Sequence, residues 1–254
     1  MMETCILLGN GINLCTFDHK DIDWSQLIER IKDDYGVENC NYLSYSMQFE
    51  TLVNQIFSKQ ESIKYENIKE DIAKHLNSID KTCLNDENNL HRLFVDKADS
   101  ILTTNYEFFL EESLGMAFNK KHLKHNTICN LNSYTLVNET KKIYHIHGNL
   151  EHYKTICLGY EHYAKTLQML RNTIASRNRK NKKPKIINYL DNSTKYTLNT
   201  WATKFFTDNV HIVGLGLSRE EIDLWWLITY RASLCYSNEE KYSNKIENTI
   251  TYHH

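Results

Sequence analysis

A pair of histidines at the end of an apolar, strand-like run offers the clearest chemistry in this sequence. The run spans residues 143–146, and His147 and Gly148 follow at its end. Side chains two positions apart on a strand point to the same face, so His145 and His147 would share one side of a sheet. Imidazole exchanges a proton near neutral pH, which makes His147 a candidate reactive group. A satisfied core histidine is the alternative, and a metal role lacks a third ligand at a recognisable spacing.

A second polar cluster follows the strand-like run at residues 100–103. It consists of Thr103, Thr104 and Asn105, with Glu107 two residues further on. Open α/β sheets bind ligands at the carboxyl ends of their strands, so we predict that this cluster belongs to a ligand site. A simple helix cap is the alternative, because threonine and asparagine commonly precede helices.

A glycine-bracketed turn follows the first strand-like run, at residues 5–8. It contains Gly9, Asn10, Gly11 and Asn13. Backbone N–H groups in such a turn can approach a phosphate, although the sequence is neither a G-x-G-x-x-G fingerprint nor a P-loop. A tight turn between a strand and a helix explains the pattern equally well.

A similar turn follows the run at residues 210–213. It contains Gly214, Gly216 and Ser218, and we predict that it closes on the same ligand. The structural alternative is a capping box, in which Ser218 caps the next helix and Glu221 is its partner three residues on.

These turns require a fold in which strands and helices alternate, which is typical of parallel βα units. We therefore predict an α/β protein with a parallel sheet flanked by helices. Helices are expected at residues 23–32, 106–118, 160–174 and 219–234, with a weaker strand at 155–158. The long helix-period region predicts a helical insertion after the first βα unit, roughly residues 36–97. We assign residues 1–236 to one domain and residues 237–254 to a polar C-terminal tail.

Composition argues against several other classes of protein. The net charge of −2 gives no global basic field, so we expect neither nucleic acid nor membrane as a partner. The basic stretch at residues 171–185 is expected to be a solvated loop. Seven cysteines without a C-x-x-C pair argue against a disulfide framework and a four-thiolate zinc site. The N-terminus does not resemble a signal peptide, and we predict a cytoplasmic location.

The order of the four turns is more specific than any one of them. The segments GNGIN, TTNY, HGN and GLGLS, each after a strand-like run, resemble the sirtuin superfamily. The closer resemblance is to the sirtuin-like NAD hydrolase domain of bacterial antiphage-defence (abortive infection) proteins, in which a helix like the one around Asp23 and Trp24 follows the first segment. Glu107 departs from that pattern, because the family usually has aspartate there. The cysteines also cannot build the four-cysteine zinc module of protein-deacylating sirtuins, which points away from deacylation.

The resemblance implies a Rossmann-like core that cleaves the nicotinamide–ribose bond of NAD and depletes NAD in antiphage defence. The products would be nicotinamide and ADP-ribose or its cyclic form. His147 would act as the base, Asn105 would hold the nicotinamide ribose or orient a water, and the two glycine turns would hold the diphosphate and adenosine. It requires no metal and no cofactor beyond NAD as the substrate. The expected partner is a second copy of the chain, a separate sensor or activator protein, or both. The alternatives are a non-catalytic NAD or ADP-ribose sensor subunit and, less favoured, a protein deacylase.

Overall fold

A six-stranded sheet forms the centre of the computed structural model, which describes residues 2–17, 23–38, 41–124, 130–177, 183–191, 198–236, 242 and 244–253. The strands are β1 (Thr4–Leu8), β2 (Ser100–Thr103), β3 (Thr135–Val137), β4 (Lys141–His145), β5 (Asn209–Val213) and β6 (Ile250–His253). Their order is β3-β4-β2-β1-β5-β6, and all of these pairings are parallel except that of β3 with β4. The predicted α/β fold with a Rossmann-like, mostly parallel sheet is confirmed.

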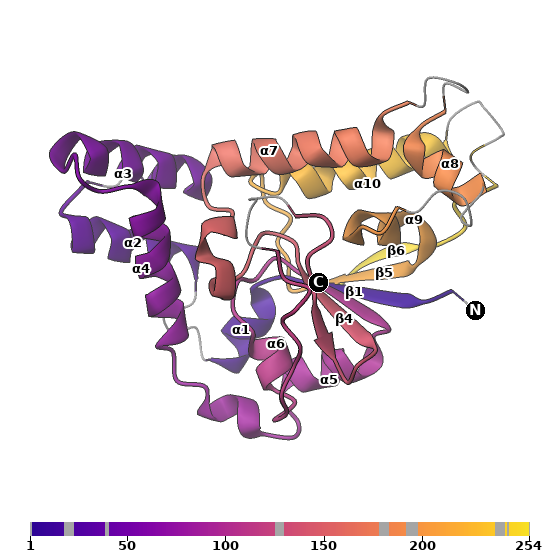
Figure 1. Ribbon diagram of the computed structural model, residues 1–254, viewed down its shortest axis with the longest axis horizontal. Coiled ribbons are helices and arrows are strands. Elements are labelled where there is room, and N and C mark those ends of the chain that lie inside the picture. Colours follow the sequence, from indigo (N-terminus) through magenta and orange to yellow (C-terminus); the bar gives the residue numbers. More distant parts are fainter. Residues whose placement is uncertain are drawn as a thin grey trace.

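Helices cover both faces of the sheet, and a further group stands beside it (Figure 1). The α-helices are α1 (Gly11–Thr16), α2 (Trp24–Tyr35), α3 (Tyr45–Lys59), α4 (Tyr65–Asn77), α5 (Leu90–Lys97), α6 (Phe109–Glu112), α7 (Tyr160–Leu170), α8 (Lys185–Asp191), α9 (Lys204–Thr207) and α10 (Ile222–Cys235). Shorter 3-10 turns are η1 (Thr82–Asn85), η2 (Leu150–Thr155) and η4 (Trp201–Thr203), and a π-helical turn, η3 (Arg171–Ala175), extends α7.

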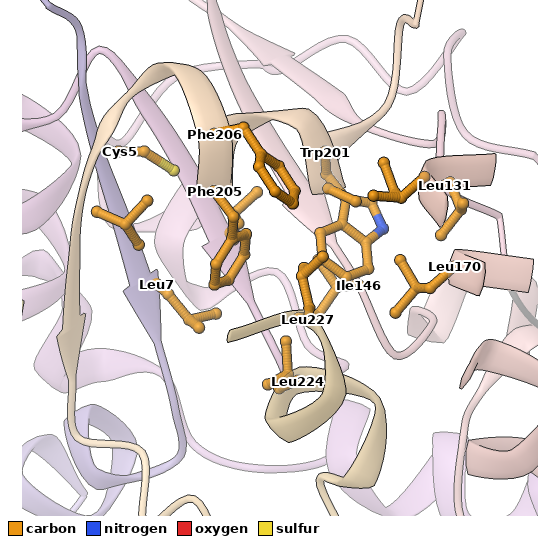
Figure 2. Close-up of a cluster of buried hydrophobic side chains, with 14 of the residues drawn as sticks. Cys5, Leu7, Leu131, Ile146, Leu170, Trp201, Phe205, Phe206, Leu224 and Leu227 are labelled. Atoms are coloured by element: carbon orange, nitrogen blue, oxygen red, sulfur yellow. The ribbon is translucent and has the colours of Figure 1, made fainter. Parts of the chain in front are cut away.

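Alternating side chains of the central strands build a separate core on each face of the sheet. Leu7 of β1 faces α7, α9 and α10, where Phe205 and Leu227 complete a buried aromatic and aliphatic cluster (Figure 2). Ile6 and Leu8, its neighbours in β1, belong to the core on the opposite face, beside α1, α5 and α6. Because both faces of β1 are buried, residues 5–8 are continuously apolar.

The helical group of α2, α3 and α4 has a core of its own, which also takes in residues of the loop around η2. Helix α2 begins where expected, because Asp23 accepts from the backbone N–H of Gln26 in a capping box. It ends at Gly36, whose left-handed backbone closes the helix. In the chain, α5 follows this group, and the helices α2 to α5 form the helical insertion predicted after the first βα unit.

Two predicted elements are wrong. The helix expected at residues 106–118 is reduced to α6, because Tyr106 forms hydrogen bonds to distant segments. Its backbone carbonyl accepts from Leu150 N–H, and its side-chain hydroxyl donates to Cys157 O (2.5 Å). The strand expected at residues 155–158 is absent. That segment is buried, but its polar groups meet a loop and a side chain, since Cys157 N–H donates to His147 O and Ile156 O accepts from Lys69 Nζ.

The end of the chain also differs from expectation. Part of the stretch expected to be a tail, Ile250–His253, forms β6 and pairs in parallel with β5. Its short length and polar sequence gave little strand signal. Among the described residues, no helix is long and apolar enough to cross a membrane. The middle of the basic stretch at 171–185 lies outside the described residues.

Candidate active site

The carboxyl ends of β1, β2, β4 and β5 meet at one edge of the sheet, where the four predicted turns come together. The chain leaves β1 toward one face, where Ile12 of α1 is buried, and leaves β5 toward the other, where Leu224 of α10 is buried. Divergent connections from adjacent parallel strands leave a crevice between them, and this is where open α/β sheets bind ligands.

A cavity of about 720 Å³ occupies this crevice, which is a volume typical of small-molecule and cofactor sites. Eight of the predicted site residues line it: Asn10, Gly11, Thr104, Asn105, His147, Gly214, Gly216 and Ser218. Gly9, Asn13 and Thr103 do not; they lie behind the wall and support it. The opposite wall comes from α2 and from residues 41–48.

The first and last turns are packed backbone against backbone. Gly9 N–H donates to Val213 O (3.0 Å), and Gly11 N–H donates to Gly214 O (2.8 Å). A Cβ atom on Gly9 would lie 2.5 Å from Gly214 O, so only glycine permits this approach. The two turns therefore form one rigid unit, which explains why glycine recurs in both.

Asn105 follows β2 and points into the space between these turns. Its backbone N–H donates to Thr103 Oγ1 (3.1 Å), and its side-chain Nδ2 makes a long contact to Gly9 O (3.4 Å). No helix begins here, since α6 begins at Phe109, so the helix-cap interpretation of Asn105 is wrong. The carboxamide lies at the cavity wall with hydrogen-bonding capacity to spare.

Glu107, which lines the cavity, is hydrogen-bonded to Asn13 behind the wall. Asn13 Nδ2 donates to Glu107 Oε1 (2.8 Å), while Asn13 Oδ1 contacts His91 Nε2 (2.8 Å). Burial raises the pKa of Glu107, and the hydrogen bond from Asn13 opposes that shift. Burial lowers the pKa of His91 to about 4, so this imidazole is neutral near pH 7. Asn13 thus fixes the carboxylate at the cavity wall.

The two histidines lie in different surroundings, although the alternation of a strand predicted a shared face. Strand β4 ends at His145, and the chain then turns at Gly148, which has a φ of +97° that favours glycine. His145 points toward α6, where its ring nitrogens meet Asn105 O (2.9 Å) and Glu111 Oε1 (3.0 Å). His147 points toward α7 and α10, packing edge-on against Tyr163.

Only His147 keeps a ring nitrogen for chemistry. Both contacts of His145 are to acceptors, so both of its nitrogens donate; burial lowers its pKa, but the charge of Glu111 and the two hydrogen bonds more than offset this, and the pKa is raised. Nε2 of His147 contacts Asp223 Oδ2 (3.1 Å), whereas Nδ1 has no hydrogen-bond partner among the described residues. His147 lines the cavity and His145 does not.

Asp223, which lies in the first turn of α10, is not among the site residues predicted from the sequence. The only signal for it was its place shortly after the last glycine turn. Ser218, predicted as a possible cap of this helix, is not one: α10 begins at Ile222, and the Ser218 hydroxyl instead contacts the carboxylates of Glu220 and Glu221. Burial raises the pKa of Glu221, which lines the cavity, and the hydrogen bond from Ser218 opposes that shift.

The helical wall was likewise missed as part of the site. Trp24 stacks on Tyr45, with ring centroids 6.1 Å apart, and both side chains line the cavity. The backbone N–H of Tyr45 donates to Glu220 Oε1 (3.1 Å), which joins this wall to the turn after β5. Apart from His147, the ionisable side chains that line the cavity in the described structure are acidic or phenolic; the acids are Asp23, Glu29, Glu107, Glu220 and Glu221.

Comparison with protein families gives one match. A family model described as a SIR2-like domain matches residues 99–232, just over half of the chain. The matched segment carries β2, β4, β5 and α10, and with them Asn105, His147 and Asp223. No curated protein matches the chain significantly.

Proposed function

The chain belongs to the family of SIR2-like domains, and on that premise we propose that it hydrolyses NAD to nicotinamide and ADP-ribose. The family match is compatible with an NAD-related activity; cleavage of the nicotinamide–ribose bond is our proposal. The observation that carries it is the convergence of Asn105 and His147, 42 residues apart in the sequence, on the wall of one cavity at the ends of neighbouring strands.

The reaction needs few protein groups. As the bond between C1′ and the pyridinium nitrogen breaks, its electron pair goes to the nicotinamide, and the ribose becomes an oxocarbenium-like cation. A water attacks C1′, and its proton passes to Nδ1 of His147. Asn105 holds the ribose hydroxyls or the water by its carboxamide. Carboxylates such as Glu107 and Glu221 favour the developing positive charge.

The remainder of the substrate fits the paired turns. The diphosphate would lie against the backbone of residues 10–11 and 214–216, which lines the cavity. Trp24 and Tyr45 offer aromatic faces for a planar ring. The acidic lining suits a cationic pyridinium and leaves phosphate binding to backbone N–H groups.

Chromatography of NAD incubated with the purified protein tests the proposal. We expect the wild type to release nicotinamide. In both His147→Ala and Asn105→Ala, kcat should fall by about 100-fold or more. Binding of ADP-ribose, measured by calorimetry, should persist in both variants and serves as the control for folding. Normal turnover in either variant would remove that residue from the mechanism.

Binding without any nicotinamide release by the wild type would favour the sensor subunit instead. We also propose that the activity serves antiphage defence and is controlled by self-assembly or by a separate activator. Nicotinamide release measured against protein concentration tests this control, because a constant specific activity down to verified monomer would exclude self-assembly.

A further inference from the structure

We propose that Asp223 is a positioning residue, which holds the proton of His147 on Nε2 and so directs the lone pair of Nδ1 into the cavity. This inference rests on the proposed function, because it assigns the atom of His147 that receives the proton of water. Asp223 itself does not line the cavity, so it acts through His147 rather than on the substrate.

The side chains of the pair are almost fully buried. His147 and Asp223 have 2% and 0% of their side-chain surface exposed, and 3.1 Å separates Nε2 from Oδ2. They come from elements 76 residues apart, since His147 follows β4 and Asp223 lies in the first turn of α10. In the described structure Oδ1, the other carboxylate oxygen, is buried and has no hydrogen-bond partner.

Stability does not explain this arrangement. A buried carboxylate loses its hydration, and an unpaired oxygen adds to that cost, so a buried pair of this kind gives little or no net stabilisation. The N-terminus of α10 compensates in part, because the dipole of a 14-residue helix favours a negative charge in its first turn. The first turn of α10 thus places the carboxyl group of Asp223 beside a single ring nitrogen.

An anionic carboxylate can only accept, so Nε2 of a neutral His147 must carry the ring proton. The lone pair is then on Nδ1, the nitrogen with no partner among the described residues. His145 shows the contrasting case, because acceptors at both nitrogens leave it no lone pair. Edge-on packing of Tyr163 fixes the ring plane from the side.

The tautomer can be observed directly by ¹⁵N NMR of histidine-labelled protein. The chain has 12 histidines, and comparison with His147→Gln identifies the His147 signals. At a pH where the ring is neutral, we expect the wild type to show a protonated Nε2 and an unprotonated Nδ1. The other neutral tautomer, with its proton on Nδ1, would overturn the proposal, and the tautomer itself is measured on the wild type.

Asp223→Asn supplies the second test. Its amide can donate to Nε2 and so reverse the tautomer, and we expect kcat to fall about 100-fold or more with KM within about threefold. The matched control is Asp208→Asn, a buried carboxylate at the far end of β5 that pairs with Lys204 (2.8 Å); its kcat and the His147 spectrum should stay as in the wild type. Unchanged kcat in Asp223→Asn would overturn the positioning role.

The two measurements separate this inference from the proposed function. If the wild type releases no nicotinamide but shows the Nε2–H tautomer, which Asp223→Asn reverses, the proposed reaction fails and the positioning of His147 stands. If nicotinamide is released but neutral His147 carries its proton on Nδ1, the positioning role of Asp223 is wrong and the proposed reaction stands.

Discussion

The two walls of the cavity are built by different means. On the strand-end wall, buried residues are fixed by hydrogen bonds between loops, as at Gly9 and Gly11, which donate to the turn after β5. On the helical wall, Trp24 packs against the core of the helical group and stacks on Tyr45, which is 39% exposed. The histidine that lines the cavity, His147, is on the first wall, so we infer that proton transfer resides on the rigid wall and ligand fit on the softer one.

The largest effect we predict is a loss of stability from a substitution that weakens the support of the rigid wall and changes no residue lining the cavity. His145→Ala removes the charged partner of Glu111 and leaves this buried carboxylate with the Thr135 hydroxyl as its remaining donor in the described structure. Loss of one member of a buried ion pair typically costs about 3–5 kcal/mol of unfolding free energy. Turnover of the folded fraction should stay within about tenfold of the wild type, because His145 does not line the cavity.

Urea unfolding and steady-state kinetics measure the two effects separately. His145→Ala combined with Glu111→Ala is the control: it removes both charges and should recover part of the lost stability. A loss of turnover as large as that of His147→Ala, at normal stability, would contradict the division between the two histidines.

The residues of these walls could be predicted from the sequence only where a local pattern indicates their position. Asn105 and His147 could be predicted as site residues because each follows a strand, and parallel strands bring their carboxyl ends to one edge of the sheet. The sequence could not show that Asn13 and Thr103 lie behind the wall, since residues on and behind a turn share the same local pattern. Asp223 could not be predicted, because its partner His147 is 76 residues away and no local sequence pattern indicates the contact.

The fold shows the same limits. The central strands contain apolar runs and were predicted within a residue or two. Residues 106–118 carry a helical pattern, but the tertiary bonds of Tyr106 override it. The short strands β3 and β6 lie at the two edges of the sheet, where half of the backbone groups are unpaired and the apolar signal is weak.

An intermediate effect is predicted for the softer wall. Trp24→Ala should raise KM for NAD about tenfold while kcat stays within about threefold, because an aromatic face lost from a binding site costs roughly 1–3 kcal/mol of binding. Steady-state kinetics check this. Trp226→Ala is the matched control, since Trp226 stacks on Tyr230 in α10 and does not line the cavity. A fall in kcat with unchanged KM would place Trp24 in the chemical step and erase the contrast between the walls.

The smallest predicted effect concerns the link between the walls, the hydrogen bond from Tyr45 N–H to Glu220 Oε1. It is exposed, so Glu220→Ala should cost less than about 1 kcal/mol of unfolding free energy and change KM by no more than about threefold. The loss of this hydrogen bond should instead increase local opening of the backbone. Hydrogen exchange of residues 41–48 should quicken by a few-fold, because this segment loses its anchor to the turn after β5, while the strand-end wall keeps its protection. Glu70→Ala, which removes an exposed carboxylate paired with Lys74 on the same helical group, should leave that exchange unchanged. Faster exchange at residues 9–11 as well would mean that the two walls open as one body, and the rigid and soft walls would then no longer be separate.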